Sequence, residues 1–436
     1  INIFSSNSSF QWLKRNISPK EHQSIINLGE INIKTHNETK RVYAYRNVAS
    51  HIVGYVNIDQ KGLSGIERYY NSQLEMSEDI HLTININLQQ AVRKRLLNKI
   101  TEYDADNGLA VVMDITNGNI LSSVSLPDFN PEKNSTFNNK NLVNRVIQSN
   151  FEMGSTFKPL TATIGYDLDI IQPNKTFDVK KKYKGISDHL PYKDDGIYNV
   201  EKIIVESSNI GTAQIASLIG KINQKSFFKK IGFEDKVEIE ILESAEPLGN
   251  KNNWGPLETA TIGFGHGFSV TPLHLVKAYA TLANGGFIVN PTLNKVNKYN
   301  ESEIVLNKNT SSRYFLNLLQ AVISKTKFTG PRVKIEGYNI GGKTGTTELV
   351  NPEGGYFNDR NLTSFISVFP INNPKYIVYT AIEYPKNTEN TNQRMTGAVV
   401  NAPLVKEIIL DMIRILNISR NENSEYLKAD TNLIYT

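Results

Sequence analysis

The sequence predicts an α+β fold in which an antiparallel sheet carries a helical insert. Apolar runs typical of strands occur at residues 108–125 and again from residue 333 onward. Residues 150–330 between them are mostly helical in pattern, and residues 401–416 predict a closing amphipathic helix. The order of strands, helices, strands and a final helix favours an α+β arrangement.

The first elements are predicted by periodicity and turn chemistry. Residues 81–85 (HLTIN) predict a short strand or a linker. Residues 87–100 predict a helix, because Leu88, Val92, Leu96 and Ile100 recur every four positions on one face. Residues 108–125 predict two strands joined at Asn117-Gly118, since Asn-Gly is a strong hairpin signal.

The later elements follow from capping residues and apolar runs. Residues 208–220 predict one helix. Residues 271–286 predict another, with Thr271 as the N-cap, Pro272 at the first helical position and two glycines past its end. Strands are predicted within residues 333–347, at 362–370 and at 375–384.

The chain divides into three predicted parts. Residues 1–80 are polar and irregular, and they predict a small extended N-terminal pedestal module with little core of its own. Residues 81–420 predict the main domain, and residues 421–436 a loose polar tail. No run of 18 apolar residues exists, and we expect that a segment preceding Ile1 could hold a membrane anchor.

Composition excludes several functional classes. With 39% hydrophobic and 21% charged residues, the 436-residue chain has an ordinary globular composition. The net charge of +5 is spread along the chain without a recognisable nucleic-acid module, so nucleic-acid binding is not predicted. No cysteine is present and the seven histidines form no H-E-x-x-H pair, so neither thiol chemistry nor a metal site is expected.

Residues 337–347 (GYNIGGKTGTT) allow two interpretations. They satisfy the phosphate-loop pattern G-x-x-x-x-G-K-[ST], and they also contain the K-T-G element Lys343-Thr344-Gly345. A phosphate loop must open a helix, but the residues that follow include several glycines, a proline and β-branched residues. We therefore expect no nucleotide site. On a strand, Gly345 would allow close approach of a ligand backbone.

Residues 151–160 (FEMGSTFKPL) contain a candidate nucleophile and base. If a helix starts near Gly154, Ser155 and Lys158 lie one turn apart on the same face. A lysine amine can activate a serine hydroxyl if the amine is neutral. Burial, or a second cation such as Lys343, would lower the pKa of the Lys158 amine and so favour its neutral form. The S-x-x-K pattern alone is weak, because it recurs at Ser226/Lys229 and Ser324/Lys327.

Order and context give the pattern its weight. Ser155, then the S-x-N pair Ser207/Asn209 at a helix start, then Lys343 on a glycine-flanked strand, follow one another along the chain. We expect these three distant segments to converge, with the hydroxyl of Ser155 between the amines of Lys158 and Lys343.

This triplet of motifs resembles the penicillin-interacting serine acyltransferases. The residues that flank the three motifs in this chain are similar to those of class B penicillin-binding proteins. Asn209, in its SSNIG context, is similar to the residue of the division-type (septal, FtsI-like) branch. The family usually has proline where Met153 stands. The resemblance covers nearly the whole chain, through FQWLKR (10–15), residues 51–74, 144–161, 206–216, 262–286, 341–347 and 396–409.

The resemblance implies a penicillin-binding transpeptidase fold and a peptidoglycan D,D-transpeptidase without metal or cofactor. Ser155 would attack the D-Ala-D-Ala amide of a stem peptide, and Lys158 would take its proton. Ser207 and Asn209 would relay a proton to the leaving amine. Lys343 would be a fifth catalytic residue and would bind the terminal carboxylate together with Thr344. The substrate-binding residues would be Thr344, Gly345, Thr346 and Thr347, and the N–H groups of Ser155 and Thr346 would form an oxyanion hole.

The resemblance also implies partners and a location. The partners would be stem peptides that supply the D-Ala-D-Ala donor and the amine acceptor, β-lactam antibiotics, a membrane glycan polymerase and divisome proteins. The catalytic domain would be periplasmic, anchored to the bacterial inner membrane at the division septum.

Other interpretations stay open from the sequence alone. A D,D-carboxypeptidase or a β-lactamase-like hydrolase could use the same scaffold, and a non-catalytic β-lactam sensor is a further alternative. A bifunctional enzyme with a glycosyltransferase domain has too little chain before Ser155. Trp12 is interpreted as a packing residue and His266 as a loop residue.

Overall fold

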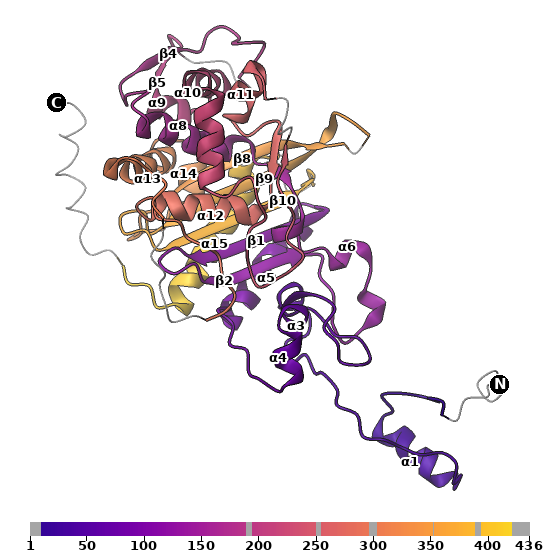
Figure 1. Cartoon of the computed structure of the whole chain (residues 1–436). Helices are drawn as coiled ribbons and strands as arrows, with labels where there is room; N and C mark the ends of the chain where they lie inside the picture. Colours follow the sequence, from indigo (N-terminus) through magenta and orange to yellow (C-terminus); the bar gives the residue numbers. More distant parts are fainter. Residues whose placement is uncertain are drawn as a thin grey trace.

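A five-stranded sheet in the order β2-β1-β10-β9-β8 forms the centre of the fold (Figure 1). The computed structural model describes residues 10–188, 194–249, 254–295, 303–351, 353–388 and 394–420. Every pair of neighbouring strands in this sheet is antiparallel. The predicted α+β class with an antiparallel sheet is confirmed.

The central strands are β1 (Asn107–Asp114), β2 (Ile120–Leu126), β8 (Gly341–Val350), β9 (Tyr356–Phe369) and β10 (Tyr376–Glu383). The described residues also form two smaller sheets, from β3 (Phe151–Glu152), β7 (Phe268–Val270) and β6 (Leu248–Gly249), and from β4 (Thr176–Asp178) and β5 (Ile197–Asn199).

The helices are α1 (Pro19–Asn27), α2 (Ser50–Val53), α3 (Gly65–Tyr69), α4 (Asn71–Glu75), α5 (Ile86–Glu102), α6 (Asn139–Leu142), α7 (Arg145–Gln148), α8 (Lys158–Asp167), α9 (Val200–Val205), α10 (Asn209–Lys230), α11 (Pro256–Ile262), α12 (Pro272–Ala283), α13 (Asn309–Lys325), α14 (Thr329–Val333) and α15 (Gly397–Ile415). The described residues also include the 3₁₀ turns η2 (Asn134–Thr136) and η3 (Gly154–Phe157).

Both faces of the central sheet are covered by helices. Ala110 and Val112 of β1 belong to one core together with α5 and α15. The alternate residues Val111 and Met113 belong to the other core, together with α8, α12 and α13. Successive side chains of a strand point to opposite faces, so this alternation places the sheet between two helical layers. It also explains why β1 and β10 are buried along nearly their whole length.

The local predictions for the first part of the domain are confirmed. Helix α5 covers the predicted 87–100 segment, and Leu88, Val92 and Leu96 are buried. Strands β1 and β2 form the predicted hairpin. Gly118 has a φ of 75°, and a Cβ there would lie 2.0 Å from the carbonyl oxygen of Asn290. Only glycine fits this turn.

The helical insert differs from the prediction in one respect. Helix α12 has the predicted N-cap Thr271, which accepts a hydrogen bond from the N–H of His274. Helix α10 has Ser208 as its N-cap, and the chain leaves helical geometry at Gly220 (φ 76°), where the prediction ended the helix. The helix then resumes up to Lys230, because buried Phe227 and Phe228 pack into the core.

The N-terminal residues contribute unequally to the core. Helix α1 has no buried residue and lies apart from the remainder of the protein in Figure 1. Ile52 and Ile66, by contrast, belong to the same core as Val111. Trp12 packs beside Arg15 while staying 46% exposed. The domain boundary near residue 80 therefore stays a prediction, and the predicted loose tail at 421–436 lies outside the described residues.

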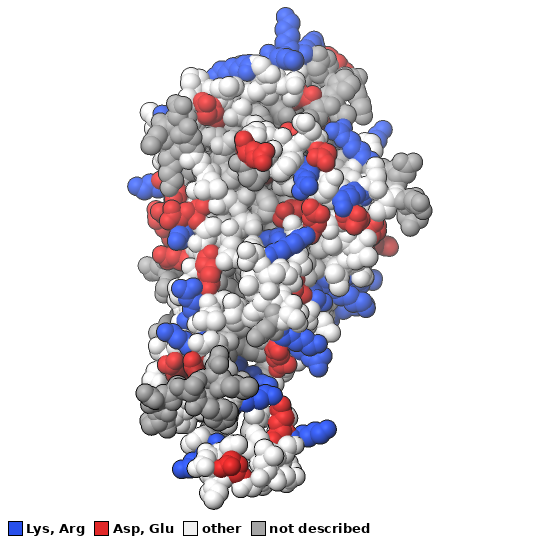
Figure 2. Space-filling view, turned by 90° about the vertical axis from the view of Figure 1, so that its right-hand side faces the viewer, with Lys and Arg blue, Asp and Glu red and all other residues white. Residues whose placement is uncertain are grey.

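Charged side chains of both signs are interspersed over the face shown in Figure 2. Several form ion pairs between elements distant in sequence, such as Arg95 of α5 with Asp411 of α15. Within the described ranges, no helix has the length and apolar character needed to cross a bilayer.

Candidate active site

The segment that carries Ser155 is a 3₁₀ turn that leads directly into α8. The predicted helix near Gly154 therefore begins as η3, and Lys158 is the first residue of α8. Gly154 has a φ of 52°, and a Cβ on it would lie 2.3 Å from Thr347 Oγ1. Its N–H donates a 3.0 Å hydrogen bond to the carbonyl oxygen of Gly265. Glycine is thus required where the nucleophile turn meets β8.

Ser207 is held in an uncommon backbone conformation. Its φ is 59°, which a residue with a side chain adopts rarely. It lies between the end of α9 and the start of α10, where the hydroxyl of Ser208 accepts a hydrogen bond from the N–H of Gly211. Such conformations persist when the surrounding structure fixes them, and they gather at functional sites.

Lys343 lies on β8, as predicted, and β8 is one of the two edge strands of the central sheet. Residues 341–350 form one continuous strand and do not open a helix. The phosphate-loop interpretation is therefore wrong, since that loop needs helix N–H groups around the phosphates.

The three segments converge on the hydroxyl of Ser207. Lys158 Nζ donates to Ser207 Oγ (3.2 Å), and Lys343 Nζ donates to the same oxygen (3.0 Å). The Ser207 hydroxyl in turn donates to Ser155 Oγ (3.0 Å). Lys158 also donates to Asn209 Oδ1 (2.7 Å) and to the carbonyl oxygen of Ser207. All five candidate catalytic residues thus lie together.

The geometry differs from the sequence expectation in one detail. We expected the Ser155 hydroxyl between the two amines, but Ser207 occupies that place. Within the described residues, no hydrogen bond joins Ser155 directly to Lys158. Ser207 reaches this place because its backbone has a left-handed (αL) conformation. The spacing of residues along the sequence does not predict that conformation.

Burial sets the protonation of the two lysines. Lys158 is 0% exposed and Lys343 2% exposed. Burial, together with the nearby Lys343 ammonium, holds the pKa of Lys158 well below its ordinary value. Burial lowers the pKa of Lys343 to about 7. A neutral amine near neutral pH can act as a base toward a serine hydroxyl.

These lowered pKa values predict how stability depends on pH. In the unfolded chain a lysine keeps its proton up to about pH 10. In the folded protein Lys343 loses its proton near pH 7. The unfolded state therefore binds more protons between these values, and the free energy of unfolding should rise with pH across this window. The expected slope for one lysine is up to about 1.4 kcal/mol per pH unit. Urea unfolding at several pH values measures it.

The Lys343→Met variant is the internal comparison for this prediction. It should show a smaller slope than the wild type, whatever its absolute stability, because one shifted group is gone. The lowered pKa of Lys158 also makes the free energy of unfolding rise with pH. The Lys343→Met variant should therefore keep part of the wild-type slope. Equal slopes in the two proteins would contradict the assigned pKa of Lys343.

The four predicted substrate-binding residues fall on two sides of β8. Thr346 Oγ1 accepts a 3.1 Å hydrogen bond from the N–H of Gly397, the first residue of α15. A Cβ on Gly397 would lie 3.2 Å from Thr344 Cβ, so both threonines lie near the positive end of this helix. Thr347 instead lies against Gly154. The arrangement offers hydroxyls and a helix N-terminus to an anionic group.

Gly345 has a packing reason to be glycine, in addition to the expected approach of a ligand. A Cβ there would lie 2.5 Å from Ser364 Oγ and 3.2 Å from both the carbonyl oxygen of Met153 and Thr156 Cγ2. Its missing side chain therefore permits β8 to pack against the nucleophile turn. Contact between Gly345 and a substrate stays a prediction.

Asp188 is a functional candidate that the sequence analysis missed. Its carboxylate accepts hydrogen bonds from the N–H of Asn209 (2.5 Å), the N–H of Ile210 (3.0 Å) and the hydroxyl of Ser208 (2.7 Å). It thus fixes the first turn of α10, which positions Ser207 and Asn209. No local signal marks Asp188, because its partners lie about twenty residues away in the sequence.

Replacing Asp188 by alanine should loosen this turn. We expect a loss of about 0.5–2 kcal/mol in the free energy of unfolding, the usual cost of a lost N-terminal cap. We also expect slower acylation by penicillin, because Ser207 is no longer held between the lysines. Asp195→Ala is a matched control, since Asp195 accepts an N–H from Ile197 in a turn outside the site. Equal acylation rates in the two variants would contradict a role for Asp188.

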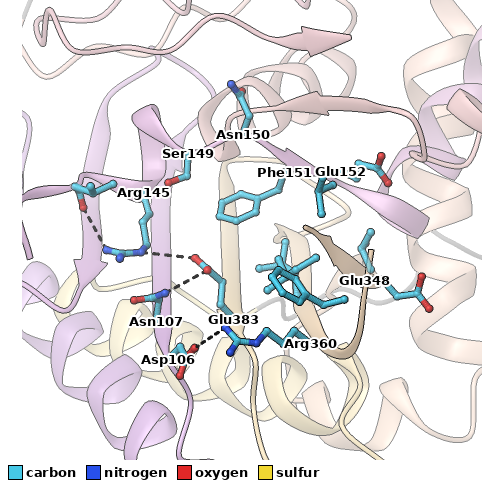
Figure 3. Close-up of a pocket in the computed structure, with 16 residues that line it drawn as sticks. Asp106, Asn107, Arg145, Ser149, Asn150, Phe151, Glu152, Glu348, Arg360 and Glu383 are labelled. Atoms are coloured by element: carbon cyan, nitrogen blue, oxygen red, sulfur yellow. Dashed lines mark hydrogen bonds and ion pairs between the residues drawn. The ribbon is translucent and has the colours of Figure 1, made fainter. Parts of the chain in front are cut away.

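A cavity of about 510 Å³ extends from the far end of β8 (Figure 3). Thr347 and Val350 line it from β8, and Phe151 and Glu152 from the segment before Ser155. On another side of the cavity, Arg145 Nε lies 3.6 Å from Glu383 Oε1. The described residues that line it include none of the five candidate catalytic residues. They come in part from β8, β9 and the end of β10, and the walls are both apolar and charged.

Known proteins resemble this chain over most of its length. Residues 108–410 match the family model described as the penicillin binding protein transpeptidase domain. The probable peptidoglycan D,D-transpeptidase FtsI of Caulobacter vibrioides is 30% identical over 420 residues, which cover 93% of this chain and 71% of that protein.

Solved structures give the same result for the fold. The apo transpeptidase domain of penicillin-binding protein 3 from Burkholderia pseudomallei has a TM-score of 0.68 and 27% identity, over 78% of this chain and 98% of that chain. Penicillin-binding protein 3 from Mycobacterium tuberculosis, complexed with ampicillin, has a TM-score of 0.79 and 22% identity, over 88% of this chain and 91% of that chain. The second likeness is one of fold.

Proposed function

This chain belongs to the penicillin-binding protein transpeptidase family, and we propose that Ser155 is its nucleophile. The chain is a serine D,D-transpeptidase of the division type, which cross-links peptidoglycan stem peptides. The observation that carries the assignment of Ser155 is the hydrogen bond from Ser207 Oγ, which connects it to two buried lysines.

Acylation begins with attack of Ser155 Oγ on the carbonyl carbon of the scissile D-Ala-D-Ala amide. The hydroxyl proton of Ser155 passes to Ser207 Oγ while Ser207 passes its own proton to the neutral amine of Lys158. The hydroxyl of Ser207 can rotate to serve as acceptor and donor in this transfer. The N–H groups of Ser155 and Thr346 hold the oxyanion that forms.

The acyl-enzyme then forms and is resolved. The C–N bond breaks, the leaving amine takes the proton back through Ser207, and free D-Ala departs. An amine of a second stem peptide attacks the ester carbonyl and loses a proton to the same relay. The new amide is the cross-link, and Ser155 regains its hydroxyl. Asn209 holds Lys158 in place through its Oδ1.

The donor peptide is oriented along the edge of β8. Its terminal carboxylate would lie at Lys343 and at the hydroxyls of Thr344 and Thr346. Because the reacting carbonyl lies at Thr346, the residues before the scissile bond would continue past Thr347 toward the cavity in Figure 3. An extended peptide antiparallel to β8 satisfies this direction, as in strand addition to a free sheet edge.

β-Lactams would acylate the same serine, because their strained amide presents a carbonyl and a carboxylate in a similar arrangement. In the cell the catalytic domain would be periplasmic and anchored to the inner membrane at the division septum. It would act with a membrane glycan polymerase and other divisome proteins.

One experiment separates transpeptidation from its rivals. The protein is incubated with a stem-peptide donor, an amine acceptor and, separately, a chromogenic cephalosporin. The proposal predicts cross-linked product together with slow release of the cephalosporin acyl group. Rapid, repeated cephalosporin hydrolysis would favour a β-lactamase-like enzyme, and D-Ala release without cross-linking would favour a carboxypeptidase. Absence of any acyl-enzyme would favour a sensor.

A further inference from the structure

Three side chains beside the nucleophile form a closed polar cluster. The carboxylate of Glu152, only 7% exposed, accepts hydrogen bonds from the Tyr356 hydroxyl (2.8 Å) and from the N–H of Gly267 (2.9 Å). Its second oxygen lies 3.0 Å from His266 Nδ1. The Tyr356 hydroxyl lies 3.2 Å from His266 Nε2. Every polar group of the three side chains thus faces another member of the cluster.

The rings of the cluster are also stacked. The imidazole of His266 lies over the ring of Tyr356 with centroids 5.0 Å apart and an interplanar angle of 25°. The ring of Phe264 also stacks with that of His266, with centroids 6.2 Å apart and an interplanar angle of 22°. In Figure 3, the carboxylate of Glu152 points away from the Arg145–Glu383 pair, toward the edge of the cavity. Through Glu152, which lines the cavity, the cluster joins the border of the cavity to the segment that precedes Ser155.

The cluster joins the three segments that frame Ser155. Glu152 ends β3, three residues before Ser155. His266 lies in the loop whose Gly265 carbonyl accepts the N–H of Gly154. Tyr356 begins β9 and pairs with Val350, at the end of the strand that carries Lys343. Contacts made at Glu152 therefore link the nucleophile turn to the far end of β8.

We infer that Glu152, His266 and Tyr356 are positioning residues that set the separation between Ser155 and the β8 edge. This separation fixes the distance between the N–H groups of Ser155 and Thr346, the two donors of the proposed oxyanion hole. Small errors in such distances are costly, because donors must meet the charge that develops in the transition state. The inference rests on the proposed role of Ser155 as the nucleophile.

The charge of His266 makes the cluster sensitive to pH. The groups that face its ring are the carboxylates of Glu152 and Glu348 and the hydroxyl of Tyr356. The hydrogen bond to Glu152 raises the pKa of His266. Protonated His266 holds Glu152 more strongly than the neutral ring, which keeps only one N–H donor. As the pH rises through this pKa, the cluster loosens.

Three conservative variants test the inference. Tyr356→Phe removes one hydroxyl and keeps the stacked ring, Glu152→Gln removes the charge, and His266→Asn keeps a short N–H donor that cannot titrate. The second-order rate constant for acylation by benzylpenicillin should fall about three- to tenfold in Tyr356→Phe and in Glu152→Gln. The ratio of the wild-type rate to the His266→Asn rate should decrease as the pH rises, because only the wild type loses a charge there.

Tyr384→Phe is the matched control, since its hydroxyl donates to Asp359 at the surface (3.1 Å). Melting temperatures show whether each variant is folded at the assay temperature. Acylation of folded Tyr356→Phe at the wild-type rate, or a wild-type to His266→Asn ratio that does not change with pH, would overturn the inference. If the wild type itself is not acylated, the proposed function fails instead, and the two failures are distinguishable.

Discussion

Replacing Ser155 by alanine is expected to abolish cross-linking and the release of D-Ala from a donor peptide. The variant loses the only atom that can form the acyl-enzyme in this account, so the rate should fall by at least about 10⁴-fold. The change removes one oxygen from a side chain that is only partly buried, so the fold should persist. Product analysis by liquid chromatography and mass spectrometry measures both reactions.

The chain offers a matched control for this experiment. Ser324 and Lys327 show the same S-x-x-K spacing, but Ser324 is exposed on α13 and its hydroxyl donates to the carbonyl oxygen of Ala321. Ser324→Ala should keep the wild-type rate. Residual turnover in Ser155→Ala at more than a few per cent of the wild-type rate would mean that another group attacks the substrate.

Replacing Lys158 by methionine should produce the second largest effect. Methionine fills much of the same buried space but cannot accept a proton, so the relay through Ser207 ends without a base. General-base catalysis contributes about 10²–10⁴-fold, and we expect acylation by benzylpenicillin to slow by this factor. Stopped-flow or quenched mass spectrometry on the folded variant measures the rate.

Although Lys158→Met should be acylated more slowly, its stability should not fall. Burial of an amine is costly, so Lys158→Met should be at least as stable as the wild type at neutral pH. Lys327→Met, on the exposed control pair, should change neither property. If Lys158→Met kept the wild-type acylation rate, the base would have to be Lys343, the other amine that donates to Ser207.

Much of the fold could be predicted because its signals are local. The face of α5 follows from the four-residue spacing of Leu88, Val92 and Leu96, and the β1–β2 hairpin from Asn117-Gly118. Helix α12 begins where Thr271 and Pro272 predict it. In each case the residues that decide the structure lie within one or two turns of chain. The continuation of α10 past Gly220 was missed, since tertiary packing outweighs the local break.

The members of the active site could be predicted, but not their arrangement. Order along the chain brought Ser155, Ser207 and Lys343 together as candidates. That Ser207 lies between the amines depends on a backbone conformation with φ of 59°, which no sequence pattern marked. Asp188 and the Glu152–His266 pair were missed for a related reason. Their partners lie far away in the sequence, so only the folded chain brings these charges into contact.

Mass spectrometry after exposure to benzylpenicillin is the sharpest test of Ser155 as the nucleophile. The intact protein should gain the mass of one penicillin, and proteolysis should place the adduct on Ser155 in the sequence FEMGSTFK. Failure of the folded protein to gain this mass, or an adduct on any other residue, would contradict the assignment of Ser155 as the nucleophile.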